Sequence, residues 1–229
     1  MADLPYVLLS CAASVDGYID DASEERLLLS NDEDFDRVDD VRATCDAILV
    51  GANTIRRDNP RLLVRSEARR RARVAAGRSE SPVKVTISGT GDLSPEAKFF
   101  TTGAMDKLVY CDGGSVHKAA DRLADVATVL NGGQPLELKR VLADLAERGV
   151  RRLMVEGGST LHTQFLRAGL ADELHLVIAP FLVGEPAAPR FAGPGPFPQN
   201  AGNRMRLAET RQIGDCVLLR YLPGEGARS

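Results

Sequence analysis

The chain lacks the residue patterns on which several classes of protein depend. Its four cysteines form no CxxC pair, and its three histidines lack spacings such as HExxH. We therefore expect reduced, buried thiols and no zinc or iron site. A histidine–glutamate pair followed by PCxxC is absent as well, which excludes deamination by a zinc-bound water. Neither a Ser-His-Asp order, a Walker A loop nor a kinase signature occurs, so the chemistry of those enzymes is excluded too.

The chain also lacks a large excess of charge of one sign and has no long hydrophobic run. The 229 residues include 29 Lys and Arg against 32 Asp and Glu, and 44% are hydrophobic. This balance argues against nucleic acid as a partner and is typical of a globular protein. The apolar runs are far shorter than the ~18 residues of a membrane span. Because the start MADLPYVLLSC has no basic segment, we expect no secretory signal and a soluble, cytoplasmic protein.

Short β-like runs alternate with helical stretches, which predicts an α/β fold with a mainly parallel sheet. The last third has strands without a long helix between them, so we expect antiparallel strands at the carboxyl-terminal edge. The expected strands are Tyr6–Ala13, Ala47–Val50, Val83–Ile87, Lys107–Cys111, Ala127–Leu130, Arg152–Val155, Glu173–Ile178, Met205–Glu209 and Cys216–Tyr221. The expected helices are residues 32–45, capped by Asn31, then Leu136–Arg148 and Thr160–Ala168. We expect one domain over residues 1–229, with a loose or disordered tail from about residue 223.

Two segments interrupt this order. Arg65–Arg78 holds six arginines, which favours a solvated helix or loop because the aromatic residues of an RNA-binding surface are missing. Gly184–Asn200 is rich in proline and glycine. We expect an ordered loop that packs Phe191 and Phe197 at a subunit interface or over an active cleft.

Three clusters of small and polar residues fall where expected strands end, which is where ligands bind in open α/β sheets. They are Ala12–Gly17, Gly51–Arg65 and Val155–Thr160. In the first, Gly17 permits a turn with positive φ, although a plain Asp-Gly turn explains the same residues.

The second and third clusters offer groups that bind phosphates. Gly51 to Thr54 provides backbone N–H groups and a hydroxyl, Asp58 exposes a carboxylate at the end of a short helix, and Arg65 suits a phosphate, with Arg42 in reach. An ordinary surface ion pair of Asp58 is the alternative.

In the third cluster, Ser159 and Thr160 can cap a helix whose amino terminus accepts a pyrophosphate. Glu156 would be repelled by phosphate, so we expect it to accept hydrogen bonds from a neutral group. We expect His162, just inside the helix, to be a surface or capping residue. Such groups suit an enzyme whose cofactor performs the difficult step.

The stretches SVDGYI, DAILVGANTIRRDNPRLLVR and LMVEGGSTLHTQFLRAGLADELHLVIAPFLVG resemble the reductase half of the riboflavin-biosynthesis deaminase–reductase proteins. The resemblance implies a dihydrofolate-reductase-like fold and an NADPH-dependent reductase, usually a homodimer. Its reaction reduces the ribosyl group of a phosphorylated aminouracil to a ribityl chain by hydride transfer to C1′. Because the deaminase half is missing, we expect any deamination on another polypeptide.

The resemblance also implies residue roles. The substrate residues would be Arg42, Leu62, Arg65 and Glu156. The NADPH residues would be Ala12, Thr54, Asp58, Gly89 and the stretch from Gly158 through Ser159, Thr160 and Leu161 to Gln164. Asp58 would also be catalytic, by orienting the sugar or relaying a proton.

Two positions depart from the family pattern. Arg26 and Leu28 stand where many members have a small polar residue and an aromatic residue over the substrate and nicotinamide. Two alternatives therefore stay open: a reductase of another pterin or of a secondary-metabolite intermediate, and a nucleotide-binding protein without catalysis.

Overall fold

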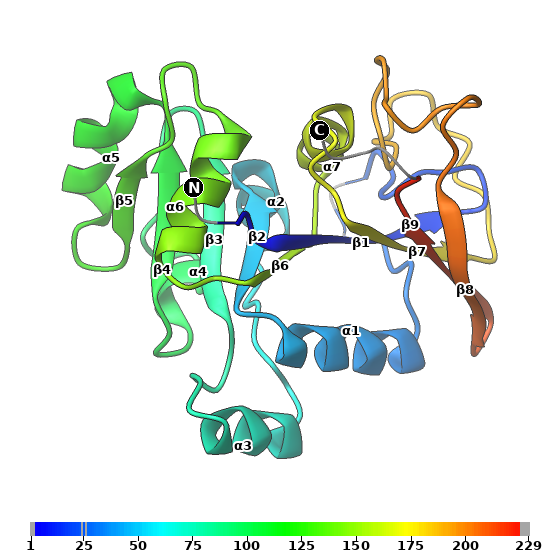
Figure 1. Cartoon of the computed structure of the whole chain (residues 1–229), viewed down its shortest axis with the longest axis horizontal. Coiled ribbons are helices and arrows are strands. Elements are labelled where there is room, and N and C mark those ends of the chain that lie inside the picture. The colour runs from blue at the N-terminus through cyan, green and yellow to red at the C-terminus, as the bar shows by residue number, and fades with distance from the viewer. Residues whose placement is uncertain (1–2, 24, 26, 225–229) are drawn as a thin grey trace. The chain divides into compact units, whose positions relative to one another are not determined.

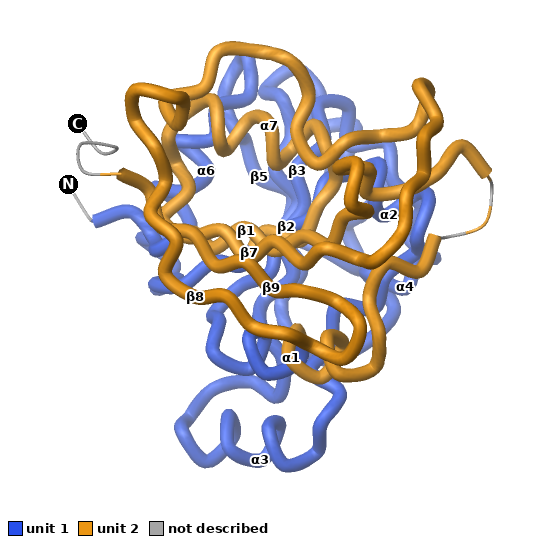
Figure 2. The backbone as a smooth tube through the Cα atoms, turned by 90° about the vertical axis from the view of Figure 1, so that its right-hand side faces the viewer, with its two compact units in different colours: residues 1–6, 39–154 blue, residues 7–38, 155–229 orange. Residues whose placement is uncertain are grey.

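The computed structural model describes residues 3–23, 25 and 27–224. The chain forms two compact units, which Figure 2 distinguishes by colour: residues 1–6 with 39–154, here called unit 1, and residues 7–38 with 155–229, here called unit 2. The single domain expected over the whole chain stays a prediction. Arg26 and positions 225–229 of the expected tail lie outside the described residues.

Unit 1 contains strands in the order β5-β4-β3-β2-β6. Their bounds are β2 Ala47–Gly51, β3 Val83–Ser88, β4 Lys107–Cys111, β5 Thr128–Asn131 and β6 Arg152–Val155. Neighbours from β2 to β5 run parallel. The first four residues of β2 are buried, as expected of a parallel strand that is covered on both faces. Their carboxyl ends therefore share one edge, where the polar clusters of this unit begin.

The helices of unit 1 connect these strands (Figure 1). They are α2 Ala52–Asp58, α3 Glu67–Ala75, α4 Lys98–Thr101, α5 Val116–Leu123 and α6 Leu138–Glu147, with a 3-10 turn at Gly113–Ser115. The sequence pattern predicts no helix at α4 or α5. Helix α4 is one turn long, and α5 buries only Ala119 and Leu123, so neither shows an apolar period over several turns.

Unit 2 contains the order β1-β7-β9-β8. Strand β1, Tyr6–Ser14, runs parallel to β7, Glu173–Ala179. Strand β9, Cys216–Leu222, is antiparallel to both β7 and β8, Arg206–Ile213. The expected antiparallel edge is thus confirmed. The sequence predicts an end of β8 at Glu209, but a register shift between Leu207 and Glu209 lets the pairing continue to Ile213.

Helix α7, Ser159–Arg167, and the first part of helix α1, Asp32–Thr44, whose residues 32–38 belong to unit 2, lie on opposite sides of β1 and β7 (Figure 1). Asn31 caps α1 as predicted, because its Oδ1 accepts the Asp34 N–H at 2.9 Å. An apolar core cluster of unit 2 consists of Leu29, Val177, Ala179, Ile213, Cys216 and Leu218. Within the described residues, every helix is too short or too polar to cross a membrane.

A charged network is buried in unit 2. Arg37 contacts Asp34 at 2.7 Å and His175 Nδ1 at 3.1 Å, and His175 Nε2 lies 2.9 Å from Glu173, which also accepts from Arg220. Because arginine only donates, His175 accepts at Nδ1 and donates from Nε2. Burial would raise the pKa of Glu173, but the hydrogen bonds from His175 and Arg220 and the positive charge of Arg220 lower it to about 2. The network therefore depends on an ionised Glu173.

Candidate functional site

The first polar corner of unit 1 joins β2 directly to α2. Gly51 is the N-cap of α2, and Asn59 ends the helix in a left-handed conformation with φ 43°. Asn59 Oδ1 accepts the Lys98 N–H at 2.7 Å, which fixes this end of the helix. Thr54 is half-buried and Asp58 is exposed. Because they are four residues apart on one helix, both side chains lie on the same helical face.

The segment after α2 brings together the other predicted residues of this corner. Leu62 has φ 49° and is buried, with only 3% of the residue exposed, so it offers a ligand little surface. Arg42 Nη1 donates to the Leu63 carbonyl at 3.1 Å. Arg65 is exposed two residues further on. Arg42 thus reaches the segment that carries Arg65, as the sequence predicts.

Gly89 lies in the turn that follows β3. It is exposed, and a Cβ at this position would meet nothing within 4 Å. Ser88 Oγ accepts the Gly91 N–H at 3.0 Å and orders the turn. The backbone at Gly89 is therefore open to close approach by a ligand.

The third corner leads from the end of β6 into α7, and its residues from Glu156 to Thr160 belong to unit 2. Glu156 is half-buried, Gly157 has φ 137°, and Gly158 is the N-cap of α7. The expected capping by Ser159 and Thr160 is wrong: both residues lie inside the helix, and no side chain caps it. The first N–H groups of the helix therefore point out of the amino terminus without a side-chain acceptor, an arrangement suited to an anion.

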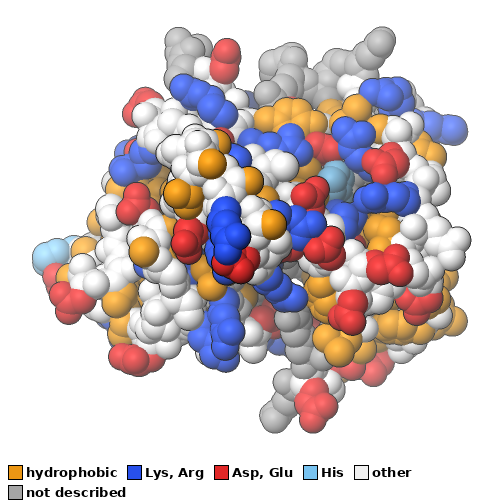
Figure 3. All heavy atoms as spheres, turned by 90° about the horizontal axis from the view of Figure 1, so that it is seen from below, with side chains coloured by type: hydrophobic (Ala, Val, Ile, Leu, Met, Phe, Trp, Pro, Cys, Tyr) orange, Lys and Arg blue, Asp and Glu red, His pale blue; other side chains and the backbone are white. Residues whose placement is uncertain are grey.

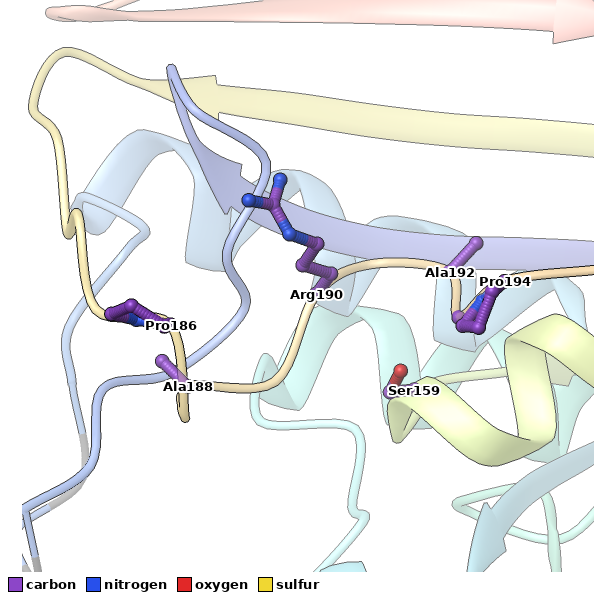
Figure 4. A pocket seen from close by; sticks show the side chains of 7 residues that line it. Ser159, Pro186, Ala188, Arg190, Ala192 and Pro194 are labelled. Atoms are coloured by element: carbon purple, nitrogen blue, oxygen red, sulfur yellow. The ribbon is translucent and has the colours of Figure 1, made fainter.

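A hollow of about 470 Å³ lies beside the start of α7 (Figure 4). Ser159 lines it from the helix, and Arg190 lines it from the loop that follows β7. The Arg190 side chain points away from Ser159 (Figure 4), donates to Tyr18 Oη at 2.8 Å and to the Asp16 carbonyl at 3.1 Å, and stacks on the Tyr18 ring. The other lining residues are Pro186, Ala188, Ala192, Gly193 and Pro194.

The loop over this hollow is bound at both ends. Asp16 accepts the N–H groups of Val183 at 3.1 Å and Gly184 at 2.8 Å, and Gly193 N–H donates to Thr163 Oγ1 at 2.8 Å. Hydrogen bonds from Ser14, Val183 and Gly184 hold the pKa of Asp16 below its usual value. The SVDGYI stretch thus has a structural role, and Gly17 has the positive φ predicted for it, 85°.

The expectation of a surface or capping His162 is wrong. Its side chain is buried, with only 1% of the residue exposed, and its ring centroid lies 5.5 Å from that of Phe191. It shares the inner face of α7 with Leu161, Phe165 and Leu166. Burial lowers the pKa of the imidazole to about 4, against the opposite effect of the Val155 backbone. The packing of Phe191 agrees with the expected ordered loop.

Two further positions singled out in the sequence, Ala12 and Leu28, differ in how exposed they are. Ala12 is half-buried and packs against the apolar core cluster of unit 2. Leu28 is 67% exposed. Among the described residues, no group of three His, Cys, Asp or Glu side chains has the arrangement of a metal site.

The arginine-rich segment is the helix α3, and its side chains contact the protein itself. Arg73 is 2% exposed and donates to the carbonyls of Ala43, Cys45 and Ser79 at 2.7–2.9 Å, which caps the carboxyl end of α1. In the view of Figure 3, basic and acidic side chains are interspersed. These contacts favour the structural interpretation of the arginines over an RNA-binding surface.

Strands that end in glycine-rich corners and are followed by helices define an α/β protein. The chain belongs to the RibD C-terminal domain family, whose model matches residues 5–219. Its fold is dihydrofolate-reductase-like, as the resemblance implies.

Two archaeal relatives are each 32% identical to the chain and are named 2,5-diamino-6-ribosylamino-4(3H)-pyrimidinone 5′-phosphate reductase. The protein of Methanothermobacter thermautotrophicus matches over 95% of this chain and 97% of its own length. That of Archaeoglobus fulgidus matches over 92% and 94%. The chain is thus similar to reductases of almost its own length.

Solved structures agree in fold. Acinetobacter baumannii RibD has a TM-score of 0.79 at 25% identity and covers 97% of this chain, which spans 59% of that protein. A pyrimidine reductase-like protein of Corynebacterium diphtheriae has a TM-score of 0.79 at 22% identity, with coverage of 96% of this chain and 92% of its own.

Proposed function

We propose that the chain is an NADPH-dependent reductase of riboflavin biosynthesis that converts the ribosyl group of a phosphorylated ribosylaminopyrimidine to a ribityl chain. The observation that carries the proposal is its match to the two archaeal reductases over nearly the full length of both partners. Their names make 2,5-diamino-6-ribosylamino-4(3H)-pyrimidinone 5′-phosphate the first substrate to test. The corresponding uracil, which the sequence resemblance implies, is the second.

In this proposal Arg65 binds the substrate phosphate. An exposed guanidinium can form two parallel hydrogen bonds to a phosphate, and the fixed segment around Leu62 limits the positions that it can occupy. Arg42 supports the same segment through Leu63, and Glu156 accepts hydrogen bonds from a neutral part of the substrate. Anchoring the phosphate restrains the sugar, so positioning supplies much of the catalysis.

The residues assigned to NADPH fit a dinucleotide in two respects. The start of α7, from Gly158 to Leu161, offers backbone N–H groups beside a hollow that Arg190 also lines. Gly89 offers open backbone, and Thr54 offers a hydroxyl. When bound, NADPH supplies the hydride. Ala12 contributes backbone, and Asp58 orients the sugar or relays a proton close to the reacting carbon.

On the basis of the family resemblance, we also propose that the protein forms a homodimer and is located in the cytoplasm. Size-exclusion chromatography with light scattering measures the first, and a mass of one chain would contradict it.

Oxidation of NADPH, followed at 340 nm, tests the activity directly. We expect turnover with the phosphorylated pyrimidinone or uracil and none with dihydrofolate. Turnover of dihydrofolate alone would favour the pterin reductase, and binding of NADPH without turnover of any substrate would favour the non-catalytic alternative. NADH in place of NADPH measures the preference for the 2′-phosphate.

A further inference from the structure

The segment Asn59–Ser66 between α2 and α3 has an irregular backbone that is unusual for its residues. Asn59 and Leu62 both have left-handed φ values, 43° and 49°. For residues other than glycine, such a conformation persists only when surrounding contacts determine it. The contacts of this segment therefore show which side chains set its shape.

Side chains from outside the segment hold its backbone at successive positions. Arg42 donates to the Leu63 carbonyl at 3.1 Å, and Ser81 Oγ accepts the Val64 N–H at 2.9 Å. Asp39 of α1 then accepts two consecutive N–H groups, that of Arg65 at Oδ1 and that of Ser66 at Oδ2, the latter at 3.0 Å.

The peptide groups on both sides of Arg65 are thereby fixed. Arg70 Nη1 donates to the carbonyls of Val64 at 3.2 Å and Arg65 at 2.6 Å, while Asp39 holds the N–H groups. With N–H and C=O both bound, the direction of the Arg65 Cα–Cβ bond is set before any ligand arrives. A cation that is held in this way loses less conformational entropy when it binds.

We propose that Asp39, with Arg70, is a positioning residue that directs Arg65 toward the phosphate of the substrate. The inference rests on the proposed function, in which Arg65 is the phosphate ligand. The residue Asp39 is 3% exposed, and Arg69 Nη1 lies 3.0 Å from its Oδ2. This ion pair offsets the buried negative charge, so the carboxylate beneath Arg65 does not oppose an incoming anion.

The substitution Asp39→Asn tests the proposal, because the amide keeps one acceptor but places an NH₂ group against the other donors. We expect the KM for the phosphorylated substrate to rise about tenfold with kcat within about twofold. The KM for the dephosphorylated nucleoside and the affinity for NADPH should not change. Inorganic phosphate, titrated by ³¹P NMR, should bind more weakly by a similar factor.

Two variants make the test specific. Asp40→Asn is the matched control, because the Asp40 side chain is 67% exposed and lies 3.3 Å from the Arg69 Nε in the same cluster. It should leave all constants unchanged. Arg70→Gln disturbs the same peptide from its carbonyl side, and we expect a smaller change in the same direction. It is the second measurement if Asp39→Asn does not fold.

Arg65→Ala separates the two claims. If Arg65→Ala weakens phosphate binding and Asp39→Asn and Arg70→Gln do not, the positioning role is refuted and the proposed function stands. Equal losses on phosphorylated and dephosphorylated substrates, or a loss confined to kcat, would also refute it. If Arg65→Ala leaves phosphate binding unchanged, the assigned role of Arg65 fails first.

Discussion

Replacing Glu173 by glutamine should destabilise the protein strongly, because the carboxylate is the centre of the buried network in unit 2. The pKa of Glu173 falls from 4.5 to about 2 on folding, since the hydrogen bonds from His175 and Arg220 outweigh the effect of burial. At about 1.4 kcal/mol per pKa unit, this difference corresponds to about 3 kcal/mol of folding free energy. Its side chain is 3% exposed, so solvent screens the pairs little.

The sign of the pH dependence follows from the lowered pKa. The contribution of Glu173 is fully present above about pH 4.5 and is lost as the pH falls toward about 2, because the unfolded chain then binds the proton more tightly. Urea unfolding at pH 7 should show the loss of about 3 kcal/mol in Glu173→Gln, and the difference from the original protein should shrink below pH 4.5.

Glu209→Gln is the matched control. Glu209 contacts Arg211 at 3.3 Å, but the two side chains are 38% and 54% exposed, so we expect a loss below about 1 kcal/mol. Equal losses in the two variants, or a difference for Glu173→Gln that does not vary with pH, would refute the reasoning.

Three further predictions concern the candidate site. NMR should show that His162 titrates with a pKa near 4. Because the imidazole of the unfolded chain takes a proton near pH 6.5, the free energy of unfolding should decrease as the pH falls from about 6.5 to about 4, and His162→Leu should remove this dependence. A pKa near 6.5 in the folded protein would contradict the burial of this side chain. Asp58→Asn should slow turnover and leave NADPH binding largely intact, so a weaker cofactor affinity at unchanged kcat would disprove its role. Arg65→Ala should lower kcat/KM for the phosphorylated substrate by an amount equivalent to about 2–4 kcal/mol, mostly through KM, and unchanged kcat/KM would remove it from the site.

The parts of the fold that the sequence predicts are those with a strong local signal. Continuous apolar runs such as Ala47–Val50, bounded by polar and turn residues, predict the strands. Gly149 and Gly169 predict the ends of α6 and α7, where both residues have positive φ. Helix α4 cannot be predicted in this way, because four residues are too few to show a helical period of apolar positions. The length of β8 depends on its pairing with β9, and the local sequence pattern carries no signal for that pairing.

The sequence predicts which residues form the candidate site but does not reveal which contacts hold them in place. Nothing local indicates that Asp39 faces the backbone of Arg65, because 26 positions separate them and the contact depends on how α1 packs. The burial of His162 follows from the loop that returns with Phe191, again a distant segment. The sequence signal that could have predicted the burial of His162 is the helical face that it shares with Leu161 and Phe165.

The fate of the transferred hydrogen tests the central claim most directly. NADPH that carries deuterium on the transferable position of the nicotinamide is incubated with 2,5-diamino-6-ribosylamino-4(3H)-pyrimidinone 5′-phosphate and, separately, with the corresponding uracil. We expect a ribityl product with one deuterium at C1′, detected by mass spectrometry and located by NMR. Deuterium at any other carbon, or a ribosyl group left unreduced with both compounds, would contradict it.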